Sequence, residues 1–246
     1  MSVATPGAHV RQHRSILAAQ ERRLLVAIAQ RLPAFVTSDL LSAIGLAGMA
    51  AVGGGFALMR WTPLGAAAVI AGLFVNWFGD SLDGTVARVR QQERPRYGYY
   101  VDHVLDVVGA SMLFAGLGMS GLMSPLVAAI VLAAFLLVSA ESYLATHVSG
   151  VFRLSSFGVG PTELRILLGA GAIAAVRRPV VSIVLLGARP LFEVGGMAAT
   201  GGLLYAFVDA AVRQIRALTA LEAGSFGTRQ TQSFGTRQAE PDRIPT

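Results

Sequence analysis

The chain has 246 residues, of which 54% are hydrophobic and only 14% are charged, with a formal net charge of +6. Soluble globular domains carry about 25% charged residues, so this composition excludes an ordinary soluble domain and favours a membrane protein. The absence of cysteine excludes disulfides and thiolate metal ligands. The basic residues are all arginines that separate apolar runs, so we expect membrane lipids, and no nucleic acid, as partners.

The N-terminal segment, residues 1–32, has the pattern of an amphipathic helix. Leu17, Leu24, Ile28 and Leu32 recur at helical spacing, with arginines at other positions of the segment. We expect this segment to lie on an anionic membrane surface as an interfacial helix. A charged leader exposed to solvent, without a function of its own, is the alternative.

Six apolar segments follow, and several reach the ~20 residues that a helix needs to cross ~30 Å of hydrocarbon. The glycines at 53–55 allow a neighbouring helix to approach the first segment closely. The fifth ends at about Val176, because the two arginines and the proline that follow would be costly at bilayer depth. In the sixth, Asp209 and Arg213 are spaced to form an ion pair. The predicted spans are about 34–59, 63–78, 99–117, 125–147, 159–176 and 191–212.

The predicted fold class is therefore all-α: a polytopic membrane protein with six transmembrane helices and an N-terminal amphipathic helix. We expect the transmembrane domain over residues 33–217. The tail over residues 218–246 repeats the sequence SFGTRQ and is too polar for a core, so we expect it to be disordered.

The distribution of arginine predicts the orientation in the membrane. Six spans place both termini on one side, and most arginines fall on that side. The arginines expected on the opposite side are Arg60, Arg177, Arg178 and Arg189. Because segments rich in arginine stay in the cytoplasm, we expect a multi-pass protein of the cytoplasmic (inner) membrane, with its termini and residues 80–106 facing the cytoplasm.

Residues 80–106 contain four aspartates beside apolar runs, where a charge is costly unless something binds it. Asp80 and Asp83 are three residues apart and Asp102 and Asp106 are four apart, so each pair shares one face of a helix. Carboxylate oxygens suit Mg²⁺ or Mn²⁺, and a cluster of them suits two ions. Helix caps and ion pairs with neighbouring arginines are the alternative explanation.

Two further residues of this stretch indicate a phosphate ligand. Gly84 follows Asp83 directly, and the lack of a Cβ lets a ligand approach the backbone. Arg88 lies four residues further on, and its planar guanidinium can contact a phosphate through two hydrogen bonds. A cation site beside these residues suggests a diphosphate substrate.

The same stretch resembles the motif of the CDP-alcohol phosphatidyltransferase family, D-x2-D-G-x2-A-R, a short spacer, then G-x3-D-x3-D. Every defined position is present: Asp80, Asp83, Gly84, Ala87, Arg88, Gly98, Asp102 and Asp106. The resemblance implies a CDP-activated donor whose diphosphate lies on two metal ions, and an acceptor hydroxyl that attacks it with release of CMP. Family members commonly dimerise, so the resemblance leaves a homodimer open as a possible partner.

Carried over residue by residue, the resemblance implies roles for the motif. Asp80, Asp83, Asp102 and Asp106 would be ligands of the two ions, Mg²⁺ or Mn²⁺, and Asp106 would also be the catalytic general base. The residues implied at the CDP site are Asp83, Gly84, Ala87, Arg88 and Gly98.

Outside the motif positions, four residues are candidates for the acceptor site. His103 follows Asp102 directly, as in the branch of the family that uses CDP-aminoalcohols, although helix geometry turns neighbouring side chains about 100° apart and His103 could simply pack. Arg153 and Arg165 could bind an anionic acceptor, or serve as topology signals or contacts to lipid headgroups. Glu163 lies close to Arg165 in the sequence and could pair with it.

We therefore expect an enzyme of phospholipid synthesis that moves a phosphatidyl group from CDP-diacylglycerol to a small polar alcohol. The alternative within the family moves a CDP-linked aminoalcohol headgroup to a lipid alcohol such as diacylglycerol. A membrane transporter or ion carrier that uses the same acids is a third hypothesis.

Overall fold

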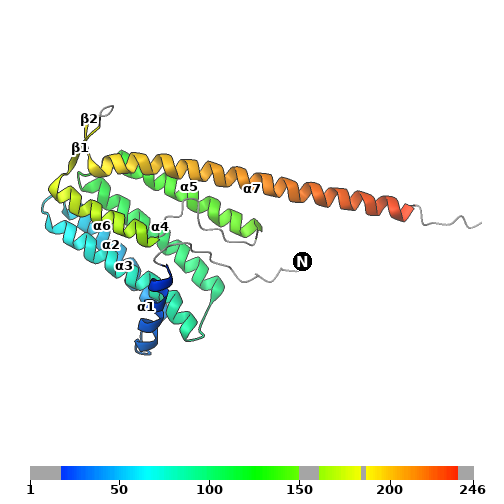
Figure 1. Cartoon of the computed structure of the whole chain (residues 1–246), viewed down its shortest axis with the longest axis horizontal. Helices are drawn as coiled ribbons and strands as arrows, with labels where there is room; N and C mark the ends of the chain where they lie inside the picture. Colours follow the sequence, from blue (N-terminus) through cyan, green and yellow to red (C-terminus); the bar gives the residue numbers. More distant parts are fainter. Residues whose placement is uncertain (1–17, 150–160, 184–186, 238–246) are drawn as a thin grey trace, which may run out of the picture.

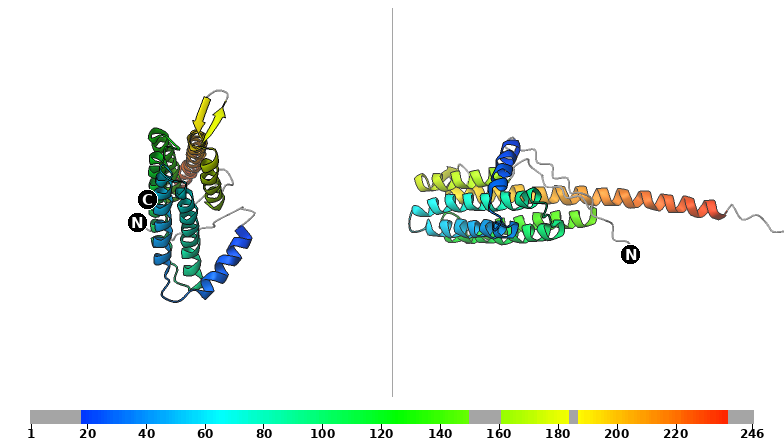
Figure 2. Two further views of the ribbon diagram at one scale, coloured as in Figure 1. Left: turned by 90° about the vertical axis from the view of Figure 1, so that its left-hand side faces the viewer. Right: turned by 90° about the horizontal axis from the view of Figure 1, so that it is seen from below.

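The structure is a computed structural model that describes residues 18–149, 161–183 and 187–237. Six helices lie side by side in a bundle, and the N-terminal helix lies against it at a steep angle (Figures 1 and 2). The elements in chain order are α1 (Ala18–Arg31), α2 (Ser38–Leu58), α3 (Leu64–Val89), α4 (Pro95–Met119), α5 (Pro125–Ser149), α6 (Pro161–Arg177), β1 (Val180–Ile183), β2 (Gly187–Pro190) and α7 (Leu191–Arg237).

The predicted fold class is confirmed: the chain is an all-α, multi-pass membrane protein, and its described residues add one small β-hairpin. Within the described residues, five helices, α2 to α5 and α7, are long and apolar enough to cross a membrane. Helix α6 occupies the place of the fifth predicted span and has 17 residues. The number of six spans therefore stays a prediction.

Helix α3 is longer than the sequence pattern predicted. The predicted apolar span ends at about Phe78, but the helix continues without a break to Val89. Residues 79–89 contain no proline, and they pack against α1 and α2. Helix α4 likewise begins at Pro95, a residue favoured at the first helical position, and not at Gly98 or Tyr99. The first half of the motif, Asp80 to Arg88, therefore lies wholly within the last turns of α3.

Helices α2 and α3 form the closest pair in the bundle because glycines line their contact. A Cβ at Gly79 of α3 would overlap the backbone of Gly45 and Leu41 on α2. In the predicted glycine triplet, Gly53 faces the backbone of α4 and Gly55 that of α3, which confirms the expected close approach. The result is a rigid connection between α2 and the residues next to Asp80.

Helix α1 is attached to the bundle through a small apolar cluster. Its Leu25 and Ala29 are buried against Leu41 of α2 and against Leu82 and Val86 of α3. Leu24, one of the predicted apolar positions, is instead half exposed. Residues 1–17 of the predicted interfacial segment lie outside the described residues.

Arg90 holds the connection from α1 to α2. Its guanidinium donates hydrogen bonds to the carbonyl oxygens of Leu32, Pro33 and Val36 at 3.0, 2.9 and 2.7 Å. These carbonyls follow the end of α1 and have no partner within a helix. The segment that links α1 to the bundle is thus fixed to the end of α3.

Two features follow α6. Strands β1 and β2 pair antiparallel, with Val180 opposite Pro190. Helix α7 then continues to Arg237, past the boundary at 218 beyond which we expected disorder, and extends well beyond the bundle (Figure 1). Residues 213–223 contain neither glycine nor proline and are rich in good helix formers, which accounts for the continuation. The predicted Asp209–Arg213 ion pair is confirmed, at 2.5 Å.

Candidate active site

Three of the four motif aspartates meet between α3 and α4. Asp80 comes from α3, and Asp102 and Asp106 come from consecutive turns of α4. One carboxylate oxygen from each lies within 4.8 Å of the others. Helix α2 packs against both α3 and α4 and so sets the relation between the two halves of the motif. Three oxygen ligands at this separation fit a hard divalent cation.

The fourth aspartate, Asp83, is directed to other partners. Its Oδ2 accepts a hydrogen bond from the hydroxyl of Ser42 on α2 at 2.6 Å, and its Oδ1 lies 2.5 Å from the backbone N–H of Gly84. Asp83 therefore stands outside the group of three converging carboxylates, and its role as a metal ligand stays a prediction.

Arg165, a candidate acceptor residue, reaches the aspartate cluster from α6. Its Nη2 donates to Oδ2 of Asp80 at 2.5 Å, and its Nε donates to Oδ1 of Asn76 at 2.8 Å. Asn76 in turn donates to the carbonyl oxygen of Gly45 at 3.0 Å. The Arg165 side chain is only 15% exposed, so a well-ordered positive charge lies directly beside the carboxylates.

Sequence reasoning missed Asn76 and Ser42. Asn76 precedes Asp80 by one helical turn within an otherwise apolar run, and a polar side chain in such a place is a signal that could have been used. Ser42 gave no such signal, because serine is common in transmembrane helices and its partner is 41 residues away in the sequence.

The residues predicted to bind CDP lie along the end of α3 and the start of α4. Nη2 of Arg88 donates to the hydroxyl of Thr85 at 3.1 Å, and a Cβ at Gly84 would come within 3.3 Å of Arg88 Nη1. Gly98 is exposed, with open space where a Cβ would stand. A cavity of about 420 Å³ lies beside Ala87. Of the predicted set, Ala87 thus adjoins space for a ligand, and Arg88 and Gly98 are exposed.

Two of the remaining candidate acceptor residues, His103 and Glu163, lie in the described part of the chain, on α4 and α6. His103 donates from Nδ1 to the carbonyl oxygen of Tyr99 at 2.6 Å, and its ring lies 4.1 Å from that of Tyr99 and 4.6 Å from that of Tyr143 on α5, measured between ring centroids. It therefore packs between aromatic rings. Glu163 lies on α6, half buried. Arg153 lies outside the described residues.

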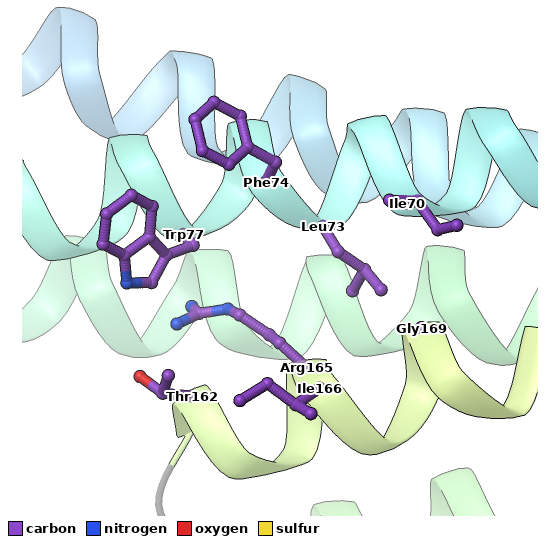
Figure 3. Close-up of a pocket in the computed structure, with 8 residues that line it drawn as sticks. All are labelled: Ile70, Leu73, Phe74, Trp77, Thr162, Arg165, Ile166 and Gly169. Atoms are coloured by element: carbon purple, nitrogen blue, oxygen red, sulfur yellow. The ribbon is translucent and has the colours of Figure 1, made fainter. Parts of the chain in front are cut away.

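An apolar groove of about 310 Å³ runs between α3 and α6 and ends at Arg165. Figure 3 shows the Arg165 side chain extending from α6 toward the end of the groove with Trp77 and Thr162, while Ile70 and Gly169 lie at the other end. The remaining lining residues are Leu73, Phe74 and Ile166. The groove thus offers an apolar surface that leads to a guanidinium, and through it to Asp80.

These features define the class of protein: a multi-pass membrane protein with an acidic cluster built on two of its helices. The family model for CDP-alcohol phosphatidyltransferase matches residues 35–208, which is most of the chain. The chain belongs to the CDP-alcohol phosphatidyltransferase family, and it is a transferase that forms phosphodiester bonds. The resemblance noted in the motif is confirmed.

Comparison with solved structures agrees with this assignment. The bundle is similar to the crystal structure of phosphatidylinositol phosphate synthase from Mycobacterium tuberculosis, solved with CDP-DAG bound. The TM-score is 0.57 at 22% sequence identity, and the match covers 78% of this chain and 94% of the other. A likeness at this identity shows a shared fold. The comparison with curated proteins gave no match.

Proposed function

We propose that this protein transfers a phosphatidyl group from CDP-diacylglycerol to a small polar alcohol and releases CMP. The observation that carries the proposal is the position of Arg165, where the apolar groove meets the aspartate cluster. The reaction is the one implied by the motif, and the structural relative was solved with this donor bound.

The groove supports the reaction in which the CDP-linked donor, and not the alcohol acceptor, carries the lipid. Acyl chains suit its lining of leucine, isoleucine and phenylalanine side chains. Arg165 at its polar end favours a lipid whose head carries negative charge. CDP-diacylglycerol has a phosphate attached directly to its glycerol, whereas diacylglycerol, the acceptor in the alternative reaction, ends in an uncharged hydroxyl.

The aspartates would hold divalent cations, a pair of Mg²⁺ or Mn²⁺ ions, with Asp80, Asp102 and Asp106 as ligands and Asp83 completing the set. Such ions would neutralise the charge of the diphosphate and of the departing CMP. Arg88 contacts the same diphosphate through its guanidinium, and Gly84, Ala87 and Gly98 leave room for the nucleotide.

Asp106 is the proposed general base, and it is the exposed member of the cluster. Its carboxylate takes the proton of the acceptor hydroxyl as the acceptor oxygen forms a bond to the phosphorus that carries the diacylglycerol. The bond from that phosphorus to the oxygen of CMP breaks. The acceptor approaches from the open side of Asp106, with His103, Glu163, Arg153 and Arg165 as candidate contacts.

The arginine distribution supports a location in the inner (cytoplasmic) membrane, with this site facing the cytoplasm. The water-soluble alcohol would then reach the site directly and CMP would leave into the cytoplasm, while the groove opens to the lipid donor. Cysteine substitutions at 60 and 94, labelled by an impermeant thiol reagent in intact cells, test this orientation, because the chain has no cysteine of its own.

The reaction is tested with purified protein in lipid nanodiscs. One arm supplies CDP-diacylglycerol, Mn²⁺ and a panel of polar alcohols, including glycerol phosphate and inositol phosphate, and follows CMP release and the mass of the lipid product. The other supplies CDP-choline or CDP-ethanolamine with diacylglycerol. We expect product in the first arm. Product in the second arm alone would show that the acceptor, and not the CDP-linked donor, carries the lipid. If CMP is released in neither arm, the proposal is overturned.

A further inference from the structure

Glu21 of α1 connects the N-terminal helix to both walls of the groove. Its Oε1 accepts a hydrogen bond from the indole Nε1 of Trp77 on α3 at 2.7 Å and one from the hydroxyl of Thr162 on α6 at 3.2 Å. One carboxylate thus joins three helices, and its two donors are themselves lining residues of the groove.

These contacts lie at the polar end of the groove. Trp77 and Thr162 stand on either side of Arg165, as Figure 3 shows. The indole can rotate about its side-chain bonds, so its position depends on the partner of its N–H group. A charged acceptor forms the stronger class of hydrogen bond and holds the ring in one orientation.

Helix α1 does not depend on Glu21 for its attachment. Leu25 and Ala29, one and two turns further along, are buried against α3, and Arg90 fixes the residues that follow α1. Substitution of Glu21 is therefore expected to leave α1 in place and to release only Trp77 and Thr162. This separation makes the role of the carboxylate testable in a folded protein.

We propose that Glu21 is a positioning residue for the lipid donor: through Trp77 and Thr162 it sets the shape of the groove beside Arg165. This inference rests on the proposed function, because it assumes that the groove holds the acyl part of CDP-diacylglycerol. It gives α1 a part in the reaction besides contact with the membrane surface. Glu21 acts on binding of the donor and leaves the chemical step to the aspartates.

The kinetic consequence is a change in KM without a comparable change in kcat. Glu21→Ala removes the carboxylate that accepts the hydrogen bonds of Trp77 and Thr162. We expect it to raise KM for long-chain CDP-diacylglycerol by roughly tenfold. Glu21→Gln keeps an acceptor oxygen in the same place and restores most of the affinity. Arg23→Ala, on an exposed face of the same helix, is the matched control and leaves KM unchanged.

Trp77 offers a direct reading of the contact that needs no turnover. The chain has two tryptophans, so a Trp61→Phe background leaves Trp77 as the sole tryptophan, whose emission can be excited selectively. In this background we expect Glu21→Ala to shift the emission of Trp77 and to increase its quenching by acrylamide, while Glu21→Gln and Arg23→Ala match the parent. Unchanged emission and quenching in Glu21→Ala would overturn the proposal.

Donor binding is read with CDP-diacylglycerol whose acyl chains carry bromine, which quenches a tryptophan that it contacts. We expect quenching in the Trp61→Phe parent and a weaker apparent affinity in Glu21→Ala. If the brominated lipid quenches Trp77 in the parent but no acceptor alcohol leads to release of CMP, the proposed reaction is rejected. The role of Glu21 is then decided by the lipid affinities of the parent and Glu21→Ala, measured by this quenching. Absence of quenching in the parent, or equal affinity in the two proteins, would reject the role of Glu21.

Discussion

The guanidinium of Arg165 lies 2.5 Å from the carboxylate of Asp80, although the two residues are 85 positions apart in the chain. Arg165 belongs to α6, whereas the motif belongs to α3 and α4. The acidic cluster therefore has a positive neighbour that the motif does not contain. Because Arg165 also lines the groove, it connects the cluster to the surface proposed for the lipid.

This position predicts opposite effects of Arg165→Ala on two properties. A positive charge beside a cation site weakens cation binding, so its removal should tighten binding of Mn²⁺, by up to roughly tenfold. Removal of the guanidinium should also raise KM for CDP-diacylglycerol, because the lipid phosphate loses its partner. Calorimetric titration with Mn²⁺ and steady-state kinetics measure the two effects.

Two variants control this prediction. Arg165→Lys keeps the charge but loses the planar pair of donors, so Mn²⁺ binding should stay near that of the parent while KM rises. Arg213→Ala breaks an exposed ion pair with Asp209 on α7 and should change neither property. Weaker Mn²⁺ binding in Arg165→Ala would contradict the electrostatic argument.

Asp106→Asn should separate chemistry from binding. The amide keeps the shape of the side chain but cannot accept the proton of the acceptor hydroxyl, so kcat should fall by about 10²–10⁴. Binding of brominated CDP-diacylglycerol, followed by quenching of Trp77, should fall much less than turnover, because Asp80, Asp83 and Asp102 would still hold the cations. Asp80→Asn is the comparison, since loss of this carboxylate should weaken the metal-dependent binding of the donor itself. Turnover at the parent rate in Asp106→Asn would exclude it as the base.

The sequence predicted what depends on local spacing. Asp102 and Asp106 are four residues apart, so any helix through them brings both to one face, and the structure confirms that they lie together. The start of α5 at Pro125 was predicted from the apolar run that begins there. Such features need no knowledge of how the helices pack.

What the sequence could not predict depends on packing between distant segments. The contacts of Arg165 with Asp80, Ser42 with Asp83 and Glu21 with Trp77 join residues 85, 41 and 56 positions apart. The end of α3 was placed too early because the prediction stopped the span near the first charged residue, whereas the backbone of a helix continues until a residue or a partner ends it.

Gly79→Ala should disturb the site through the backbone. The added methyl group would overlap the backbone of α2 at Gly45 and Leu41, where no flexible side chain can move away. Overpacking of this kind costs about 1–3 kcal/mol. Because Asp80 is the next residue, we expect a lower melting temperature together with a loss of turnover.

Gly54→Ala is the matched control for this substitution. Gly54 lies on α2 between two glycines that contact neighbouring helices, but it is exposed and a Cβ there meets open space. Alanine favours a helix over glycine by up to about 1 kcal/mol, so this variant should melt at the same temperature or higher and keep its turnover. Equal melting temperatures for the two variants, measured in the same detergent, would show that α2 and α3 can separate at Gly79.

Ser42→Ala tests the role of the aspartate that stands apart from the other three. If Asp83 completes the metal site, the hydroxyl of Ser42 orients one of its oxygens, and loss of such an orienting partner lowers metal affinity by about 10–100-fold. We therefore expect weaker binding of Mn²⁺ in Ser42→Ala and a larger loss in Asp83→Asn. Ser111→Ala is the control, since its hydroxyl bonds only to the backbone of its own helix at Val107 among the contacts described. Mn²⁺ affinity equal to that of the parent in both Ser42→Ala and Asp83→Asn would limit the ligands to Asp80, Asp102 and Asp106, and the site would then hold its cations without the first helix of the bundle.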